Sequence, residues 1–573
     1  MPVAAGALYL ALLAAGAVRA AETPAGPEAG SKKLAELTQQ LKADPKRADL
    51  WLARSRLRVQ MHDAVGALAD ASEAVRLEPF NADHRLARAE LLAGQGRWAE
   101  VVADATDGVA AAPRRADLLL LRARAHRLLG RPDAALADAT GAVEASQGSP
   151  ESLLERAWIH AFRGDWEAVG KDAAAAAAKR PELAEAVLLQ GIAHRERGEW
   201  DQAVERFTQA LKAEPKSALA LLNRGQALAR KGAAAEALRD FTLAIERNPE
   251  LAEAHLARAR LRTDRGELHG AVEDLGRAIQ LRPTLAEAYV LRAVARERLG
   301  EVALAAEDGQ VALSLGSKDP QVFLVLARVD EARGAWSALL EHARRVLDAS
   351  PKEAEACRLL SRAHQALGQD REALEALNKA VEADPKDWRS FTERAAFHNR
   401  KRNPEAALAD VTQAIALAPK TPFVYTLRAR LLLGQNRSAE AVRDCDRALA
   451  IEADDAMALL VRARAYAQMG NKSAALADCA KAAKAAPDWA WTHATLGHVL
   501  QRAGRHEEAI QALARALATA PNDAEAHATL GRAFLALRRY RSAAQHLDRA
   551  VELDPQMAQE LAKELEEVKN RRE

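Results

Sequence analysis

The sequence is poor in cysteine and in aromatic residues, and it carries almost no net charge. Cys357, Cys445 and Cys479 are the three cysteines among 573 residues, aromatic residues make up 4% of the chain, and the formal net charge is +2. Three cysteines build no disulfide framework, and a chain so close to neutrality gives no general case for binding nucleic acid. Cysteine use leaves the compartment open, because a chain without disulfides suits both the cytosol and an oxidising envelope.

Motifs of catalysis are missing as well. The sequence contains no GxxxxGK[ST] phosphate loop, no GxSxG elbow, no CxxC pair and no HExxH pair. Each of these motifs places the reactive or metal-binding groups of a well-known reaction class. We therefore expect a protein that is not an enzyme and that uses no cofactor and no metal.

A period of 34 residues runs through nearly the whole sequence. Proline fills thirteen of the sixteen slots that begin at Pro45 and follow one another every 34 residues to Pro555. Within one period, residues 218–249, apolar residues at three- and four-residue spacing mark two helices, and Gly232 breaks the pattern between them. Such a hairpin cannot bury both apolar stripes alone, so the pattern predicts an all-α solenoid of stacked helix-turn-helix repeats. Fifteen repeats without insertion cover residues 48–557.

Three positions of each repeat are kept small, counting Ala48 as position one of repeat 1. Position eight is Gly, Ala or Ser in all fifteen repeats, position twenty is Ala in twelve, and position twenty-seven is Ala in thirteen. Glycine follows the first helix in eleven repeats, and an aromatic residue such as Trp200 often stands two residues later. Small residues allow paired helices to approach closely.

This pattern resembles the tetratricopeptide repeat (TPR) family over about nine-tenths of the chain. The resemblance implies a right-handed superhelical solenoid whose first helices line a concave groove, where a peptide or a segment of a partner protein lies. Asn223 is the only Asn at position six, so the Asn ladder of the array in O-linked N-acetylglucosamine transferases is not reproduced. The Lys and Asn pattern of the clamps that hold the carboxylate of chaperone tails is absent too.

Arg at position seven and Asp at position twenty-three occur together. Ten repeats carry both residues and five carry neither. Asp172 is kept in repeat 4 although repeat 5 has Gln190 in place of Arg, which argues against pairing between neighbouring repeats. We therefore predict ion pairs that join the two helices of one repeat, not catalytic carboxylates; examples are Arg224 with Asp240, Arg258 with Asp274, and Arg428 with Asp444.

Position nine, which the resemblance places on the groove, is Arg in eight repeats. An acidic or phosphate-bearing partner would suit such a lining. The alternative is a solvated face in which each Arg pairs with a nearby Glu. The candidate groove residues in the C-terminal half are Arg328, Arg362, Arg430 and Arg464.

Position two is Asp or Glu in nine repeats, where a carboxylate favours the positive end of the helix dipole. Repeats 11 to 14 have no carboxylate at position two, and the apolar groups gathered at this rim predict a docking patch for a partner. A second, smaller aromatic site is predicted in repeat 4. The alternative for these side chains is packing in the seams between repeats. The rim candidates are Trp388, Arg389, Phe423, Met457, Trp489 and Trp491, and those of repeat 4 are Trp158 and Phe162.

The N-terminal segment is typical of a secretory signal peptide over residues 1–20. An apolar run from Val3 to Val18 precedes a small-residue cleavage site after Ala20, and the run is too short for a membrane span of about 20 apolar residues. A misassigned start or an Ala-rich tail is the alternative. Residues 21–30, rich in Pro, Gly and Ala, are expected to form a linker.

Two segments flank the repeats. Residues 31–47 contain only the second half of a repeat and are expected to cap the N-terminal end of the array. Residues 558–573 place Leu561, Leu565 and Val568 on one face among charged residues, which predicts a capping helix that covers the last open surface.

Together these features predict a non-catalytic scaffold or adaptor. It would bind other proteins or peptides, with acidic partners favoured, and would be exported to the periplasm or the cell surface with no transmembrane span after cleavage; the cytoplasm is expected if the N-terminal segment is not a signal. The alternative function is a regulatory or substrate-presenting subunit of a separately encoded envelope enzyme, such as one in a polysaccharide-synthesis complex. Repeat arrays share their framework and differ in surface residues, so the sequence does not identify the partner.

Overall fold

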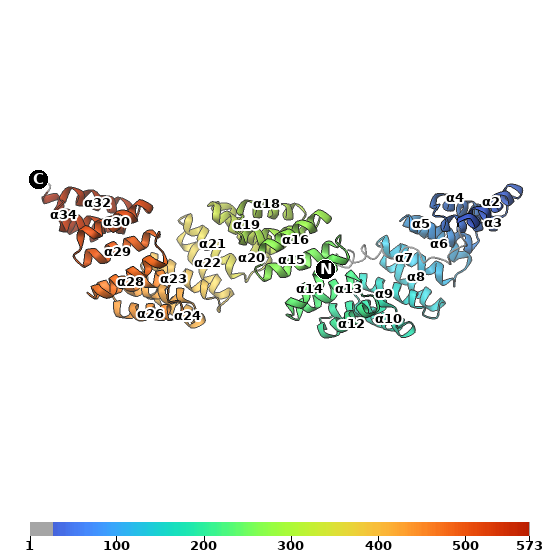
Figure 1. Ribbon diagram of the computed structural model, residues 1–573, viewed down its shortest axis with the longest axis horizontal. Helices are drawn as coiled ribbons and strands as arrows, with labels where there is room; N and C mark the ends of the chain where they lie inside the picture. Colours follow the sequence, from blue (N-terminus) through green and yellow to red (C-terminus); the bar gives the residue numbers. More distant parts are fainter. Residues whose placement is uncertain (1–26, 572–573) are drawn as a thin grey trace. The chain divides into compact units, whose positions relative to one another are not determined.

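The computed structural model describes residues 27–571, which form 33 helices and contain no strand (Figure 1). The predicted signal peptide lies outside the described residues. Helices α3 to α32 form fifteen consecutive pairs that coincide with the repeats read from the sequence. The chain divides into two compact bodies: the first holds the described residues up to Glu301 and Val311–Ser317, and the second holds Val302–Gln310 and the described residues from Lys318 on.

The first body contains repeats 1 to 7, the first helix of repeat 8 and the N-terminal cap. Its helices are α2 (Pro27–Ala43), α3 (Ala48–Gln60), α4 (Ala64–Leu77), α5 (Ala82–Gly94), α6 (Trp98–Ala111), α7 (Ala116–Leu128), α8 (Pro132–Ala145), α9 (Pro150–Arg163), α10 (Trp166–Lys179), α11 (Ala184–Glu196), α12 (Trp200–Ala213), α13 (Ala218–Arg230), α14 (Ala234–Arg247), α15 (Ala252–Asp264), α16 (Leu268–Leu281) and α17 (Ala286–Arg298).

The second body contains repeats 9 to 15 and the C-terminal cap, and α18 of repeat 8 divides between the two bodies. The helices are α18 (Val302–Ser314), α19 (Pro320–Arg333), α20 (Trp336–Ala349), α21 (Ala354–Ala366), α22 (Asp370–Ala383), α23 (Trp388–Arg400), α24 (Pro404–Leu417), α25 (Pro422–Gly434), α26 (Ser438–Ile451), α27 (Ala456–Gln468), α28 (Lys472–Ala485), α29 (Ala490–Arg502), α30 (His506–Thr519), α31 (Ala524–Ala536), α32 (Tyr540–Leu553), α33 (Met557–Glu560) and α34 (Ala562–Asn570).

The small positions lie where the two helices of a repeat meet. Ala237 and Ala244 of α14 are fully buried, and Phe241 between them packs on Gly225 of α13. A Cβ atom at Gly225 would lie 2.6 Å from the ring of Phe241, so any larger residue would push the helices apart. Position eight is glycine in four repeats, and in each of them a Phe or Leu at position twenty-four packs against it: Gly191 with Phe207, Gly225 with Phe241, Gly497 with Leu513, and Gly531 with Leu547.

The turn between the two helices has a left-handed residue at position fifteen in every repeat. Glycine supplies it in eleven repeats, for example Gly232 with φ of 82°. The other four repeats hold a side chain at φ of 56° to 62°, an uncommon conformation for residues other than glycine. Those residues are His62, Arg402, Asn436 and Arg538.

Neighbouring repeats stack through two kinds of helix contact. The second helix of a repeat packs on the first helix of the next, as α26 does on α27, and first helices also pack on one another, as α25 does on α27. First helices of neighbouring repeats therefore approach one another, and they form what we call the first-helix face. Their approach is closest among α25, α27, α29 and α31.

The caps differ from the boundaries expected from the sequence. The linker expected over residues 21–30 is too long, because α2 begins at Pro27 and residues 27–30 are helical. At the other end, the single capping helix expected over residues 558–573 is divided into α33 and α34, because the chain turns at the buried Leu561. Leu561 and Val568 pack with Leu547 of the last repeat. No helix in residues 27–571 is long and apolar enough to cross a membrane.

Candidate partner-binding surface

The Arg and Asp pairs form inside single repeats, and their geometry is repeated. In each described pair, Arg Nε donates to Oδ2 of Asp while Nη2 donates to Oδ1; the distances are 2.7 Å and 2.7 Å for Arg224 with Asp240, and 2.7 Å and 2.8 Å for Arg428 with Asp444. The hydrogen bond to Asp444 is the largest cause that raises the pKa of Arg428 above its ordinary value. The nine pairs are Arg54 with Asp70, Arg88 with Asp104, Arg122 with Asp138, Arg156 with Asp172, Arg224 with Asp240, Arg258 with Asp274, Arg394 with Asp410, Arg428 with Asp444, and Arg462 with Asp478.

The same arginines also reach the preceding repeat, which the sequence reasoning missed. Nη1 of Arg394 donates to Asn378 at 3.0 Å, and Nη1 of Arg462 donates to Asp446 at 2.6 Å. The acceptor occupies position twenty-five of the preceding repeat. A signal for it exists: this position is Thr, Ser, Asn or Asp before nine of the ten arginines and is none of these before the five other repeats. Seven of these guanidinium groups hold their own hairpin and the previous one together, and these residues serve the fold.

Most of the arginines at position nine are neutralised within the chain. Arg328 Nε donates to Glu355 at 2.7 Å, and Arg362 lies between Glu331 and Glu393, each at 2.8 Å. Burial alone would lower the pKa of Arg362, but hydrogen bonds to the two carboxylates raise it above its ordinary value. Six of the eight arginines are paired in this way: Arg124 with Glu155, Arg260 with Glu287, Arg328 with Glu355, Arg362 with Glu331 and Glu393, Arg464 with Glu525, and Arg532 with Glu564.

Arg430 and Arg56 are the exceptions at position nine. Both side chains are exposed, and neither makes an ion pair or a hydrogen bond within residues 27–571. Arg260 and Arg328 reach position two of the next repeat, and for Arg430 that position holds Met457. For Arg56 the same position holds Asp83, which pairs with Arg115 instead.

The second body curves enough for side chains to skip a repeat. Arg464 of repeat 13 would face Trp491 of repeat 14 by the same register, and it instead pairs with Glu525 of repeat 15. Arg402 of repeat 11 likewise donates a hydrogen bond to Gln556 at the end of repeat 15. The close approach of the first helices in repeats 12 to 15 accounts for the reach of Arg464.

His498 occupies position nine of repeat 14 on the same face. Burial, and then the charge of Arg464, lower the pKa of His498 to about 4. Arg502 and Arg532 also disfavour its protonation, whereas Glu525 favours it. His498 is therefore neutral at physiological pH and adds no charge to the first-helix face.

The predicted rim of repeats 11 to 14 consists of two aromatic pairs. The rings of Trp388 and Phe423 lie 6.3 Å apart between centroids, and those of Trp489 and Trp491 lie 5.3 Å apart. The guanidinium of Arg389 lies 4.8 Å from the centroid of Trp388. Phe423 is 53% exposed and Trp489 is 37% exposed. Each pair therefore has one ring at the surface.

The other rim residues are partly packed in seams between repeats. Met457 and Trp491 lie against the cluster formed by Leu432, Leu433 and Val461, and Trp491 also touches Leu460. Trp388 packs near Phe391 and Val424. We name the rim surface by its exposed members and their neighbours: the rim patch comprises Trp388, Arg389, Phe423, Met457, Trp489 and Trp491.

The aromatic site expected in repeat 4 is not formed as predicted. Trp158 is 8% exposed, and its indole N–H donates to Glu185 of the next repeat at 2.9 Å. A neighbour therefore satisfies the polar atom of this indole, and Trp158 belongs to the packing between repeats 4 and 5. Phe162 alone stays at the surface, 40% exposed.

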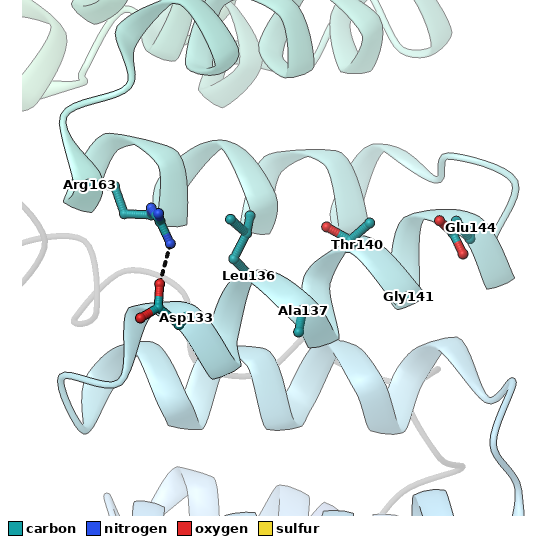
Figure 2. Close-up of a pocket in the computed structure, with 7 residues that line it drawn as sticks. All are labelled: Asp133, Leu136, Ala137, Thr140, Gly141, Glu144 and Arg163. Carbon is teal, nitrogen blue, oxygen red and sulfur yellow. Dashed lines mark hydrogen bonds and ion pairs between the residues drawn. The ribbon is translucent and has the colours of Figure 1, made fainter.

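A shallow hollow between repeats 3 and 4 carries no chemistry. Figure 2 shows Asp133, Thr140 and Glu144 of α8 along it, with Arg163 from the end of α9 paired to Asp133 at 2.5 Å. Both partners of that pair are well exposed, so it adds little stability.

The two equivalent cysteines are buried: burial raises the pKa of Cys479 to about 12 and also raises that of Cys445. Both are unreactive thiols at neutral pH.

Comparison with known families finds the tetratricopeptide repeat. One set of matches covers residues 188–252, 256–320, 426–488 and 495–558, and a second covers residues 354–387. Together they span just over half of the chain. No curated protein matches the sequence.

Solved structures of similar proteins were also found. The APC/C hetero-tetramer Cut9-Hcn1 matches with 16% identity over 84% of this chain and 96% of its own, at a TM-score of 0.43. Naa15/Naa10 bound to HypK-THB matches with 15% identity over 91% and 96%, at a TM-score of 0.32. YrrB, described as a TPR protein with an unusual peptide-binding site, matches with 25% identity over 31% and 92%, at a TM-score of 0.27.

Proposed function

Because the chain belongs to the tetratricopeptide repeat family, we propose that it is a non-catalytic scaffold that captures a partner protein through the rim patch of repeats 11 to 14. Arrays of this family present surfaces for other proteins, and the residues that distinguish one array from another lie on those surfaces. The rim patch is the stretch in which this chain departs most from its own regularity.

The observation that carries the proposal is the change at position two. Nine repeats place Asp or Glu there, and four successive repeats place Arg389, Phe423, Met457 and Trp491 instead. Phe423 packs its ring beside Trp388, and because it is 53% exposed it also offers apolar surface to a partner. Trp, Tyr and Arg side chains dominate the energy of most interfaces, and the rim patch holds three Trp and one Arg.

Cross-linking in cells tests the proposal. The tagged protein is cross-linked, purified and analysed by mass spectrometry beside a Phe423→Ala, Trp489→Ala variant, which removes the two exposed rings and spares the seams. We expect the variant to fold normally and to lose the partner. A matched control is Phe80→Ala in repeat 1, because Phe80 is 83% exposed and lies in the other body.

The result also separates the two functional classes. A partner that is lost from the rim variant and kept by Phe80→Ala supports docking at the rim patch. Recovery of one enzyme in stoichiometric amount would favour a regulatory or substrate-presenting subunit, such as one serving polysaccharide synthesis. A partner set that is identical in all three proteins would contradict the proposal.

Export is proposed on the signal-like segment alone. Residues 1–20 have the apolar run and the small-residue site that signal peptidases recognise. Mass spectrometry of the protein recovered from its own cells should find an N-terminus at Ala21 and place the protein in the periplasm or at the cell surface. A chain that keeps Met1 or Pro2 and stays with the cytosolic fraction would overturn this proposal.

A further inference from the structure

We propose that Arg430, together with Phe423, binds a protein segment that carries a carboxylate beside an apolar side chain. This inference rests on the proposed docking at the rim patch and specifies the chemistry of the partner. It follows from a register that the chain uses elsewhere to satisfy its own arginines.

The register is shown by the paired arginines. Arg260 pairs with Glu287 and Arg328 pairs with Glu355, and in both cases position nine of one repeat meets position two of the next. Trp158 donates to Glu185 across the same two positions. A side chain at position nine can therefore meet an acidic group at position two of the following repeat, and Arg124 and Arg362 instead meet a Glu at position six of that repeat.

Repeat 12 has an arginine at position nine, but the following repeat has no acid at position two. Met457 stands at position two of repeat 13, and Arg430 is exposed without an ion pair or hydrogen bond in the described chain. The nearby candidates are occupied: Arg464 pairs with Glu525, and Arg362 pairs with Glu331 and Glu393. Arg430 is thus the uncompensated guanidinium of the first-helix face beside the rim patch.

Charge complementarity selects the occupant. An external carboxylate at this place would make a charge-assisted contact like the one that Glu355 makes with Arg328. Phe423, which is 53% exposed and stands about two turns before Arg430 on the same helix, offers apolar surface on that side. Phosphate recognition generally uses several arginines, and the neighbouring ones are already paired, so a carboxylate of Asp or Glu is the occupant to which we commit.

The same register provides a variant that imitates the ligand. Met457→Glu places an acid where nine other repeats have one, so it should fold normally and pair with Arg430 internally. Met457→Gln changes the shape in the same way without adding a charge. The difference between these two variants therefore measures the use of Arg430, separately from any loss of the Met457 side chain.

The probes are fluorescein-labelled decapeptides that place one Glu beside one Leu or Phe, each matched to a peptide with Gln in place of Glu. Fluorescence anisotropy with the full chain measures their affinities. We expect the Glu peptides to bind at least about tenfold more tightly than their Gln counterparts, and Met457→Glu to bind them at least about tenfold more weakly than Met457→Gln, the effect of about one charge-assisted hydrogen bond. Arg430→Gln should remove the preference for Glu, and added salt should weaken it.

Each other outcome overturns the inference. Equal affinity for Glu and Gln peptides, equal binding by Met457→Glu and Met457→Gln, or no binding of any Glu peptide up to about 1 mM would show that Arg430 does not select a carboxylate. The cross-linking experiment keeps the two proposals distinguishable. If Phe423→Ala, Trp489→Ala loses the cellular partner but Met457→Glu retains it, docking at the rim patch stands and the carboxylate inference falls.

Discussion

Repeats 12 and 14 join the two helices of their hairpins in different ways, repeat 12 through an ion pair and repeat 14 through apolar packing. Repeat 12 joins its helices through the buried pair of Arg428 and Asp444, and a small Cys445 lies beside it. Repeat 14 has Leu496 at the position of the arginine and Ala512 at that of the aspartate. It fills the gap with a larger apolar side chain at position twenty-four, Leu513, packed against a glycine.

The difference shows that the fold requires contact between the two helices and not a particular kind of contact. Both hairpins pack their first helix on their second, α25 on α26 and α29 on α30. A buried ion pair loses much of its Coulomb energy to desolvation, so apolar residues replace it without loss when both partners change together. The coincidence of Arg and Asp in ten repeats, and of their loss in five, is the pattern expected from this rule.

The largest effect should come from removing one partner of the ion pair that joins the two helices of repeat 12. Arg428→Leu leaves the carboxylate of Asp444, whose side chain is 6% exposed, buried with no other partner in the part of the chain that the structure describes. We expect a loss of about 3–5 kcal/mol in unfolding free energy at pH 7, measured by chemical denaturation. Arg428→Leu with Asp444→Ala reproduces the residues of repeat 14 and should recover most of this loss.

The double variant provides the control for that prediction. A double variant no more stable than Arg428→Leu would contradict the pairing as the cause of the loss.

A smaller effect on stability is expected from changing the apolar packing between the two helices of repeat 14. A Cβ atom at Gly497 would lie 2.4 Å from Cγ of Leu513, an atom that rotation about the Cβ–Cγ bond of the leucine leaves in place. Gly497→Ala gains helix propensity of about 1 kcal/mol but should destabilise the protein by about 1–2 kcal/mol net through overpacking. Adding Leu513→Cys restores the combination found at Ala429 and Cys445 and should recover part of the loss. Unchanged stability in Gly497→Ala would show that this site has room to adjust.

The contact of Arg394 with the preceding repeat should contribute less stability still. Arg394 Nη1 donates to Asn378 of the preceding repeat at 3.0 Å. Asn378→Ala removes this acceptor but leaves the pair with Asp410 intact, and we expect a loss of about 0.5–1 kcal/mol by denaturation. Asn378→Thr, the residue at the equivalent Thr412, is the matched control and should be near neutral. A loss as large as that of Arg428→Leu would place the energy between repeats and not within them.

The smallest effect at neutral pH concerns His498, which stands in repeat 14 where repeats 12 and 13 have arginine. Its folded pKa of about 4 lies below its ordinary value of 6.5, chiefly because of burial. The unfolded chain then binds the additional proton between these values, so His498 lowers the stability of the protein as pH falls through this range and has no such effect above it. His498→Gln should match the parent at pH 7.5 and lose less stability at pH 5; an NMR titration of His498 with a midpoint near 6.5 would contradict this.

The repeats themselves were predictable because their period is strict. Proline and small residues at fixed positions gave the thirty helices of the array, and the linked change of Gln190 and Arg206 gave the pairing inside a hairpin. The contact that seven of the arginines make with the preceding repeat was missed, although position twenty-five carried a signal. The sequence carried no signal for the burial of Trp158, because its partner Glu185 lies in the next repeat, at a position where most repeats have an acid.

The sequence by itself determined the fold class, the number of repeats and the pairs inside each hairpin, since these depend on spacing along one short segment. The tertiary structure decided which surface groups remain for a partner. Arg430 and Arg464 occupy equivalent positions in their repeats, but Arg464 pairs with Glu525 two repeats away, and Arg430 meets no carboxylate within residues 27–571. The physical reason is that a side chain reaches several ångströms across neighbouring repeats, and the close packing of the first helices sets which charges come within that reach.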